Sequence, residues 1–189
     1  AFEGEWFKTG DIGQLDEDGY LRIIDRKKRI LVLSTGKNIA PQPVENALHQ
    51  SPYIENAVLV GQNKKYVIAL LAPDFTNLKE WCRHKGIHGS PQELLSNKQI
   101  QALLTREVTK YTKKFAQYEQ PKKLLFVNKE WTVETGELTP SLKVRYAEVE
   151  KKYKAAIDHL YAETANGEID IAADEAAVGI SLPRVKGEQ

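Results

Sequence analysis

Two runs of β-type residues separated by a short polar turn limit the fold of this chain most strongly. The runs AVLV and YVIALLA lie within residues 54–74 and are joined by GQNKK, a pattern typical of a β-hairpin. A second hairpin is predicted over residues 12–24, where DEDG separates two apolar runs. Successive hairpins without a regular strand–helix–strand alternation favour an α+β fold, in which helices pack on a small antiparallel or mixed sheet.

Apolar residues at helical spacing predict the helices. PQPVENALHQ begins with two prolines and predicts a short helix, with Glu45 in its first turn, where the helix dipole favours an anion. Further helices are predicted over TNLKEWCRHK, over residues 98–115 and, as one continuous amphipathic helix, over KVRYAEVEKKYKAAIDHLY. Residues 162–189 have weak periodicity, so we expect a tail or a loosely docked appendage there.

The composition argues against several classes of protein. Lys plus Arg number 27 and Asp plus Glu number 26, which disfavours a nucleic-acid-binding surface spread over the whole chain. No apolar run approaches the ~20 residues of a transmembrane segment, and AFEGEW has no feature of a signal peptide. Cys82 is the only cysteine, so we expect a cytoplasmic, reducing location and a buried, unreactive thiol. The absence of methionine and the start at Ala1 suggest a segment of a longer protein.

Three features are candidates for chemistry, and each also has an ordinary structural explanation. Thr9-Gly10-Asp11 is first of all a turn. DRKKR at residues 25–29, followed by the loop STGKN at residues 34–38, fits a solvated basic segment. Lys143 ends the turn-rich loop GELTPSLK and fits a surface lysine. Taken singly, none of the three specifies a reaction.

The order and spacing of these features resemble the C-terminal end of the adenylate-forming enzymes, which include acyl-CoA synthetases, firefly luciferase and the adenylation domains of peptide synthetases. WFKTGDIGQLDEDGYLRIIDRKK is similar to the segment from the TGD motif to the hinge, and GKNIAPQPVENAL is similar to the motif that follows. SPYIENAVLVGQNKKYVIALLAPDF and GELTPSLKVRY are most similar to the long-chain fatty acyl-CoA synthetases. The resemblance covers about residues 3–161 and rests on four separated motifs in the same order.

The resemblance implies three segments. Residues 1–27 would be the last hairpin of a large N-terminal adenylation domain, residues 28–161 a mobile C-terminal domain, and residues 162–189 a tail. The phosphate-binding loop and the acyl pocket of the family belong to the large domain, and nothing similar to that loop occurs in this sequence. We therefore expect the chain by itself to bind no cofactor and to turn over no substrate.

The resemblance also implies roles for individual residues. Asp11 would accept hydrogen bonds from the ribose hydroxyls of ATP, and Arg26 would contact the nucleotide. Lys28 matches the hinge, about which the small domain rotates between two half-reactions. Lys143 matches the lysine that bridges the acyl carboxylate and the α-phosphate during adenylation.

A loop that would line the pantetheine channel contains Ser34, Gly36 and Lys37. In relatives the residue before this glycine is commonly glycine as well, whereas this chain has Thr35, which leaves the acceptor thiol open between CoA and a carrier protein. The basic residues between 106 and 123 fit CoA phosphates and a solvated helix face equally well.

The full-length protein implied by the resemblance is an ATP-dependent ligase. It would use ATP, Mg²⁺ and CoA, would convert a fatty acid to acyl-AMP and would transfer the acyl group to CoA, with no nucleic acid as a partner. We expect no metal ligands in this chain. A fatty acyl-AMP ligase, an acyl-carrier-protein ligase and a non-catalytic interaction module with the same fold are the alternatives. Membrane association of the full-length enzyme stays open.

Overall fold

A four-stranded mixed sheet forms the centre of the protein in the computed structural model, which describes residues 2–4, 6–7, 11–15, 19–26, 29–162 and 177–182. The strand order is β10-β9-β8-β7, with β8 and β9 parallel and the other neighbours antiparallel. The strands are β7 (Ile54–Val60), β8 (Ile68–Pro73), β9 (Lys123–Val127) and β10 (Ala177–Ser181). The predicted α+β class and mixed sheet are confirmed.

The predicted hairpin over residues 54–74 supplies β7 and β8. Val58 pairs with Leu70 across the two strands, and Leu125 lies beside Leu70 on β9. These three side chains face one side of the sheet, while the residues that alternate with them, such as Leu59 and Phe126, face the other side. Both faces are buried, which explains why the runs are almost continuously apolar.

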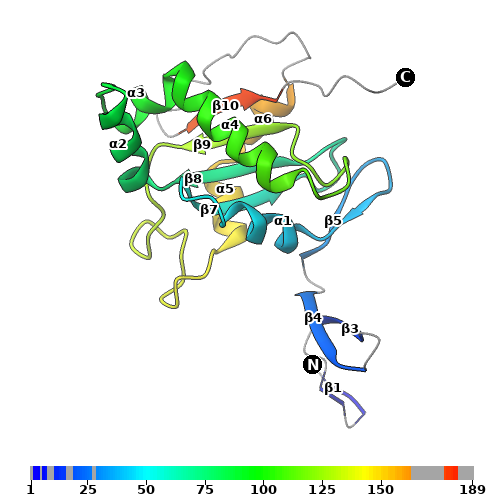
Figure 1. The fold of residues 1–189 in the computed structure, drawn as a ribbon. Coiled ribbons are helices and arrows are strands. Elements are labelled where there is room, and N and C mark those ends of the chain that lie inside the picture. Colours follow the sequence, from blue (N-terminus) through cyan, green and yellow to red (C-terminus); the bar gives the residue numbers. More distant parts are fainter. Residues whose placement is uncertain are drawn as a thin grey trace.

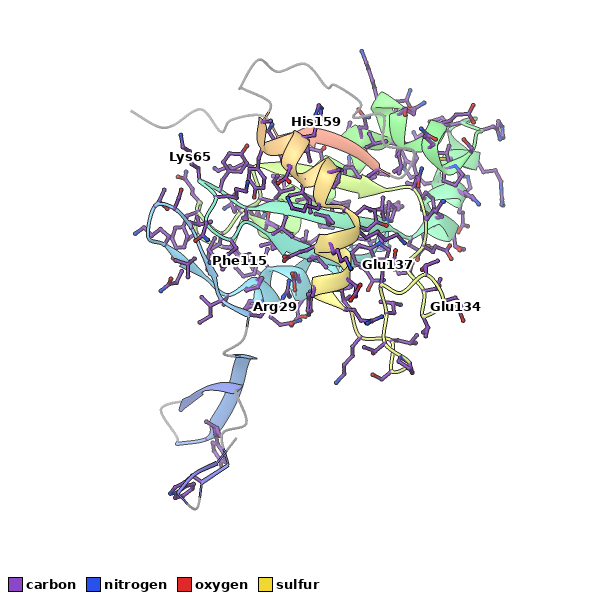
Figure 2. All side chains as sticks on the ribbon, turned by 180° about the vertical axis from the view of Figure 1, so that it is seen from behind. Arg29, Lys65, Phe115, Glu134, Glu137 and His159 are labelled. Atoms are coloured by element: carbon purple, nitrogen blue, oxygen red, sulfur yellow. The ribbon has the colours of Figure 1, made fainter. Side chains whose placement is uncertain are left out.

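Helices cover both faces of this sheet (Figures 1 and 2). One face packs against the first four helices and the opposite face packs against the last two. Three of the first four connect β8 to β9, which is how two parallel neighbours are joined. The helices are α1 (Pro41–Leu48), α2 (Phe75–His84), α3 (Pro91–Ser96), α4 (Lys98–Thr112), α5 (Tyr146–Lys152) and α6 (Lys154–Ala162).

The prediction of one continuous helix over the segment KVRYAEVEKKYKAAIDHLY is wrong. The helix is interrupted at Tyr153, whose φ and ψ are −100° and 15°. The interruption is local, because Tyr153 N–H still donates to the carbonyl of Val149, and Ile157 N–H to that of Tyr153. The backbone departs from helical angles where the Tyr153 ring is buried, with its centroid 6.4 Å from that of Trp131.

Strand β10 lies in the segment for which the sequence predicted only a tail. Ala177 pairs with Val127 and Ile180 with Leu124, so β10 covers an edge of β9. Ala177, Val178 and Ile180 are buried, and α6 packs closely on the strand, since a Cβ atom at Gly179 would lie 2.6 Å from Leu160 Cδ2. Residues 163–176 and 183–189 lie outside the described part of the chain.

The N-terminal strands lie away from the central sheet (Figure 1). Among the described residues they pair only with one another, β1 with β2 and β3 with β4. The second pair is the hairpin predicted over residues 12–24. The strands are β1 (Phe2–Glu3), β2 (Trp6–Phe7), β3 (Asp11–Leu15) and β4 (Leu21–Arg26). Within the described part of the chain, every helix is too short or too polar to span a membrane.

Candidate functional site

Lys143 lies at the exit of a closed turn, residues 138–144, which we call the Lys143 turn. Thr139 N–H donates to the Lys143 carbonyl at 2.8 Å, and Lys143 N–H donates to Thr139 Oγ1 at 3.1 Å. Leu142 N–H donates to the Thr139 carbonyl at 2.8 Å, with Leu142 at a φ of 57°. Leu138 and Val144 form a β-bridge that closes the turn. The backbone at Lys143 is therefore fixed by local hydrogen bonds.

The side chain of Lys143 is exposed, unlike the backbone that carries it. Among the described residues, none accepts a hydrogen bond or forms an ion pair with its ammonium group. Leu142 beside it is 71% exposed. The turn thus exposes a cation and an apolar side chain, and the cation can contact an anionic group on another domain or molecule.

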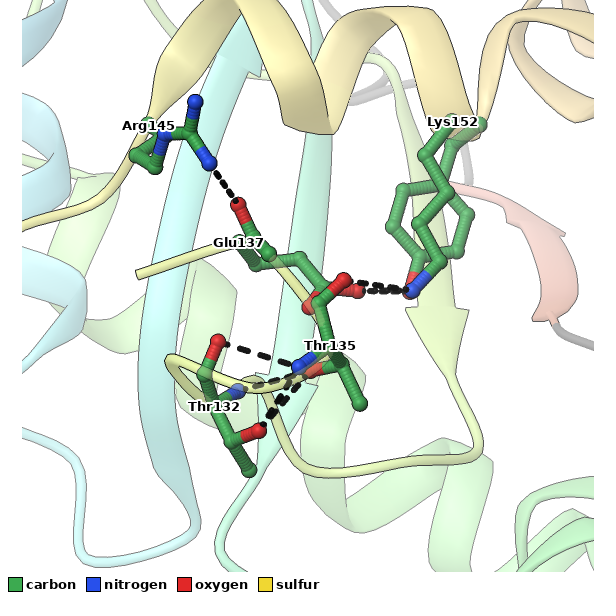
Figure 3. A network of polar contacts seen from close by, with 7 residues as sticks. Thr132, Thr135, Glu137, Arg145 and Lys152 are labelled. Carbon is green, nitrogen blue, oxygen red and sulfur yellow. Dashed lines mark hydrogen bonds and ion pairs between the residues drawn. The ribbon is translucent and has the colours of Figure 1, made fainter. Parts of the chain in front are cut away.

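A buried carboxylate connects the preceding loop to α5 (Figure 3). Glu137 is only 2% exposed, and its carboxylate pairs with Lys152 and accepts a bond from the Tyr153 hydroxyl at 3.4 Å. Burial raises the pKa of Glu137, but hydrogen bonds, led by the one from Lys152, outweigh burial and hold this pKa below its ordinary value. The carboxylate is consequently ionised at neutral pH and paired with a cation of α5.

Hydrogen bonds within residues 132–145 strengthen this attachment (Figure 3). Thr132 and Thr135 each donate their N–H to the other's hydroxyl oxygen, at 3.0 and 3.1 Å. Arg145 donates its N–H to the Glu137 carbonyl at 2.7 Å and its guanidinium to the Gly136 carbonyl at 3.2 Å. Gly136 has a φ of +91°, a conformation that favours glycine. These bonds join the segment before the Lys143 turn to Arg145 after it, and Glu137 and Lys152 connect that segment to α5.

The loop with Ser34, Gly36 and Lys37 is a second exposed turn. It connects β5 (Leu31–Val32) to β6 (Asn38–Ile39), and Gly36 adopts a φ of +78°. Ser34 N–H donates to the carbonyl of Lys64 at 2.9 Å, so the β7–β8 turn supports this loop. The ammonium of Lys37 lies 5.6 Å from the ring centroid of Tyr118.

The predicted site residues whose side chains the structure describes do not form a single cluster. The β5–β6 loop and the loop that carries Lys143 project from different sides of the sheet and its helices (Figure 1). Asp11 and Arg26 are backbone partners across β3 and β4, which brings the two predicted nucleotide contacts side by side. Their side-chain positions and the whole of Lys28 lie outside the described part of the structure.

The interpretation of Glu45 as a first-turn anion of a helix is wrong. Glu45 is the fifth residue of α1, and it is 1% exposed. Its carboxylate accepts two bonds from Arg29, at 2.5 and 2.6 Å, and one from Leu59 N–H at 2.7 Å. The sequence pattern missed this pair because its members are 16 residues apart and Arg29 belongs to a basic run.

Cys82 and the acidic residues show no sign of a reactive or metal-binding centre within the described residues. Cys82 is buried on α2, as expected, and burial raises the pKa of its thiol. No three His, Cys, Asp or Glu side chains come together there as metal ligands do.

Comparison with known proteins agrees with the family indicated by the motifs. The profile of the AMP-binding enzyme C-terminal domain matches residues 28–165. The chain is 36% identical over 163 residues to the long-chain-fatty-acid–CoA ligase FadD15 of Mycobacterium tuberculosis, a match that covers 85% of this chain and 27% of that protein. It is 32% identical over 159 residues to human long-chain-fatty-acid–CoA ligase 1, with 82% of this chain and 23% of that protein covered.

Solved structures share the fold. The adenylation domain of a carboxylic acid reductase from Segniliparus rugosus, determined with AMP and a co-purified carboxylic acid, has a TM-score of 0.68 at 22% identity, over 83% of this chain and 23% of that one. The adenylation domain of a carboxylate reductase from Mycobacterium chelonae has a TM-score of 0.66 at 25% identity over the same shares. From the profile match and the identities to the two ligases, this chain belongs to the AMP-binding enzyme C-terminal domain family.

Proposed function

We propose that this chain is the C-terminal part of a long-chain fatty-acid–CoA ligase. The chain spans about a quarter of the length of the curated relatives that it matches. A large N-terminal adenylation domain would supply the phosphate-binding loop and the acyl pocket, and this part would supply Lys143 and a second surface for the acceptor thiol. Fatty acid, ATP and CoA are the proposed substrates.

The observation that carries this proposal is the exposed ammonium of Lys143 on a turn whose backbone is fixed to α5. In the first half-reaction a fatty-acid carboxylate oxygen forms a bond to the α-phosphorus of ATP, and the bond from that phosphorus to pyrophosphate breaks. Negative charge gathers on the phosphoryl oxygens as this happens. A cation held in place beforehand stabilises that charge without reorganising during the reaction.

The second half-reaction would use the β5–β6 loop. The thiolate of CoA attacks the carbonyl carbon of the acyl-adenylate, a thioester bond forms and AMP leaves. Because the β5–β6 loop and the Lys143 turn lie on different sides of the domain, one orientation of the domain does not serve both steps. Rotation about Lys28 would exchange the two surfaces, which is the usual behaviour of a hinge between domains.

The nucleotide and metal contacts complete the proposal. Asp11 and Arg26, which are backbone partners on β3 and β4, would bind the ribose and the nucleotide from the large-domain side. Mg²⁺ would accompany ATP, and we assign it no ligand among the described residues. We further propose a cytoplasmic location.

Thr35 supports a second candidate, a ligase that uses a carrier-protein thiol. Thr35 is exposed in the turn immediately before Gly36, where a side chain adds bulk beside the proposed channel. Saturable thioester formation with free CoA supports the first candidate. Thioester formation only with a phosphopantetheine-bearing carrier protein supports the second candidate.

The two half-reactions test the proposal separately in the complete enzyme. Lys143→Ala should slow adenylate formation by about 10²–10³-fold, the scale of losing one preorganised transition-state contact. Lys28→Pro should mainly slow the transfer of preformed acyl-adenylate to CoA, because a fixed φ obstructs rotation. Both rates are measured by rapid quenching. Equal slowing of both steps by Lys143→Ala would refute the role proposed for this lysine.

A further inference from the structure

Arg29 is the first described residue after the proposed hinge, and its side chain is held on one side by Glu45. The guanidinium makes two hydrogen bonds to the carboxylate, at 2.5 and 2.6 Å. The Arg29 side chain is 15% exposed and that of Glu45 is 1% exposed. Glu45 is itself held by α1 and by Leu59 N–H of β7. Arg29 is therefore attached to the interior of the domain within one residue of Lys28.

A tyrosine of α5 covers the other side of the same guanidinium. Arg29 Cζ lies 3.2 Å from the ring centroid of Tyr146. Tyr146 is the first residue of α5, three residues after Lys143, and its hydroxyl donates to Gln42 Oε1 of α1 at 3.5 Å. We call Arg29, Glu45 and Tyr146 the Arg29 clamp. The clamp joins the start of the domain to the helix that follows the Lys143 turn.

The chemistry of the Arg29 clamp fixes orientation as well as distance. A bidentate pair of guanidinium and carboxylate fixes the plane of the guanidinium, and the face of an aromatic ring packed over that cation is restrained with it. A lysine at position 29 would retain the charge but lose both the forked hydrogen bonds and the flat stacking surface. An arginine at position 29 can therefore hold the first residue of α5 against α1, which a lysine there would do less well.

We infer that Arg29 is a positioning residue for Lys143, an inference that rests on the function proposed above. The Arg29 clamp holds the N-terminal end of α5, while Glu137 and Lys152 hold the loop before the Lys143 turn against the same helix. A rotation of the domain about Lys28 would therefore move the Lys143 turn as a rigid part of the domain. Arg29 acts through Tyr146 and contacts no substrate.

Amide hydrogen exchange in the 189-residue chain tests the positioning without any enzymatic assay. Arg29→Lys and Tyr146→Leu should speed exchange at the amides of Leu142, Lys143 and Arg145 by about tenfold or more, because local opening then needs less free energy. Exchange in β7 and β8 should stay unchanged. Lys64→Met serves as the matched control, because Lys64 also lies over an aromatic ring, that of Tyr161, and pairs with Asp158, and both of these partners belong to α6.

Kinetics of the complete enzyme supply the second readout. Both clamp variants should lower kcat for adenylate formation by about tenfold or more with unchanged KM for fatty acid and ATP, since displacement of a reacting group by about 1 Å has effects of this size. Lower thermal stability with wild-type exchange in the Lys143 turn and wild-type kcat would overturn the inference, leaving the clamp a stability element. Faster exchange with an unchanged kcat would instead overturn the function proposed for Lys143.

Discussion

Removing the cation from the pair Glu137–Lys152 should destabilise the protein more than removing the anion. Lys152→Met retains the length of the side chain but leaves the buried Glu137 carboxylate without its cation, with the Tyr153 hydroxyl still bound. Glu137→Gln removes the charge and retains the shape, and its amide oxygen still accepts a bond from Lys152. The first change leaves a charge uncompensated in the interior, whereas the second does not.

The expected magnitudes follow from the burial of each partner. Loss of one member of a fully buried pair costs about 3–5 kcal/mol, but Lys152 is 45% exposed, so we expect about 2 kcal/mol for Lys152→Met. Glu137→Gln should cost about 1 kcal/mol, the scale of one charge-assisted hydrogen bond exchanged for a neutral one. The double variant should resemble Glu137→Gln alone, which leaves a coupling energy of about 2 kcal/mol.

Thermal and urea denaturation of the 189-residue chain measure these differences. A loss of 1 kcal/mol lowers the Tm of a protein of this size by roughly 2–4 °C, so Lys152→Met should lower it by roughly 4–8 °C. If the losses of the two single variants simply add in the double variant, the pair has no coupling and the proposed attachment of the loop to α5 is refuted.

The same pair predicts how stability depends on pH. The fold holds the pKa of Glu137 below its ordinary value of 4.5, so the unfolded chain binds this proton more readily than the folded chain. The contribution of Glu137 to stability is therefore complete above that ordinary value and is lost as the pH falls through the lower pKa of the folded state. In Glu137→Gln this part of the acid dependence should be absent, and an unchanged acid limb would contradict the assignment.

Three further predictions concern other parts of the chain. Gly179→Val should cost about 1–3 kcal/mol by overpacking against Leu160, as a Cβ atom there would lie 2.6 Å from Leu160 Cδ2; an unchanged Tm would show that β10 does not pack on α6. The 189-residue chain alone should release no pyrophosphate in a fatty-acid-dependent manner, and steady release would disprove the need for a large domain. Amides of β3 and β4 should exchange faster than those of β7 and β8, since a two-stranded sheet is marginal by itself; equal protection in a monomer would reject the division near Lys28.

The sequence predicted the elements whose signals are local. The β7–β8 hairpin is recognisable because two apolar runs flank a polar turn. Strand β10 was missed because AVGIS is short, and its partner β9 is about 50 residues earlier in the chain. The interruption at Tyr153 was missed because the apolar spacing of Val149, Tyr153 and Ile157 continues across it.

In the candidate site, too, the sequence predicted the local features and missed those that depend on distant residues. The position of Lys143 at the end of a turn-rich loop is visible in GELTPSLK, and the turn is present. The residues that hold this turn were not predicted, because Glu137 resembles an ordinary loop acid and its cation Lys152 is 15 residues later. The role of Glu45 was also not predictable from local sequence. Its position in the helix suggested an interaction with the helix dipole, whereas its carboxylate binds Arg29, 16 residues earlier.

Chemical restoration of a cation at position 143 tests the central claim most directly. In the complete enzyme, Lys143→Cys should lose adenylate formation, and S-aminoethylation should then rebuild a cation of nearly the same length. We predict that aminoethylation restores the adenylation rate by about tenfold or more, whereas iodoacetamide, which adds a neutral group, restores nothing. Buried Cys82, with its raised thiol pKa, should react slowly, and a treated Lys143→Ala enzyme controls for other cysteines. Equal recovery with both reagents, or none with either, would contradict a role for the charge of Lys143 in adenylation.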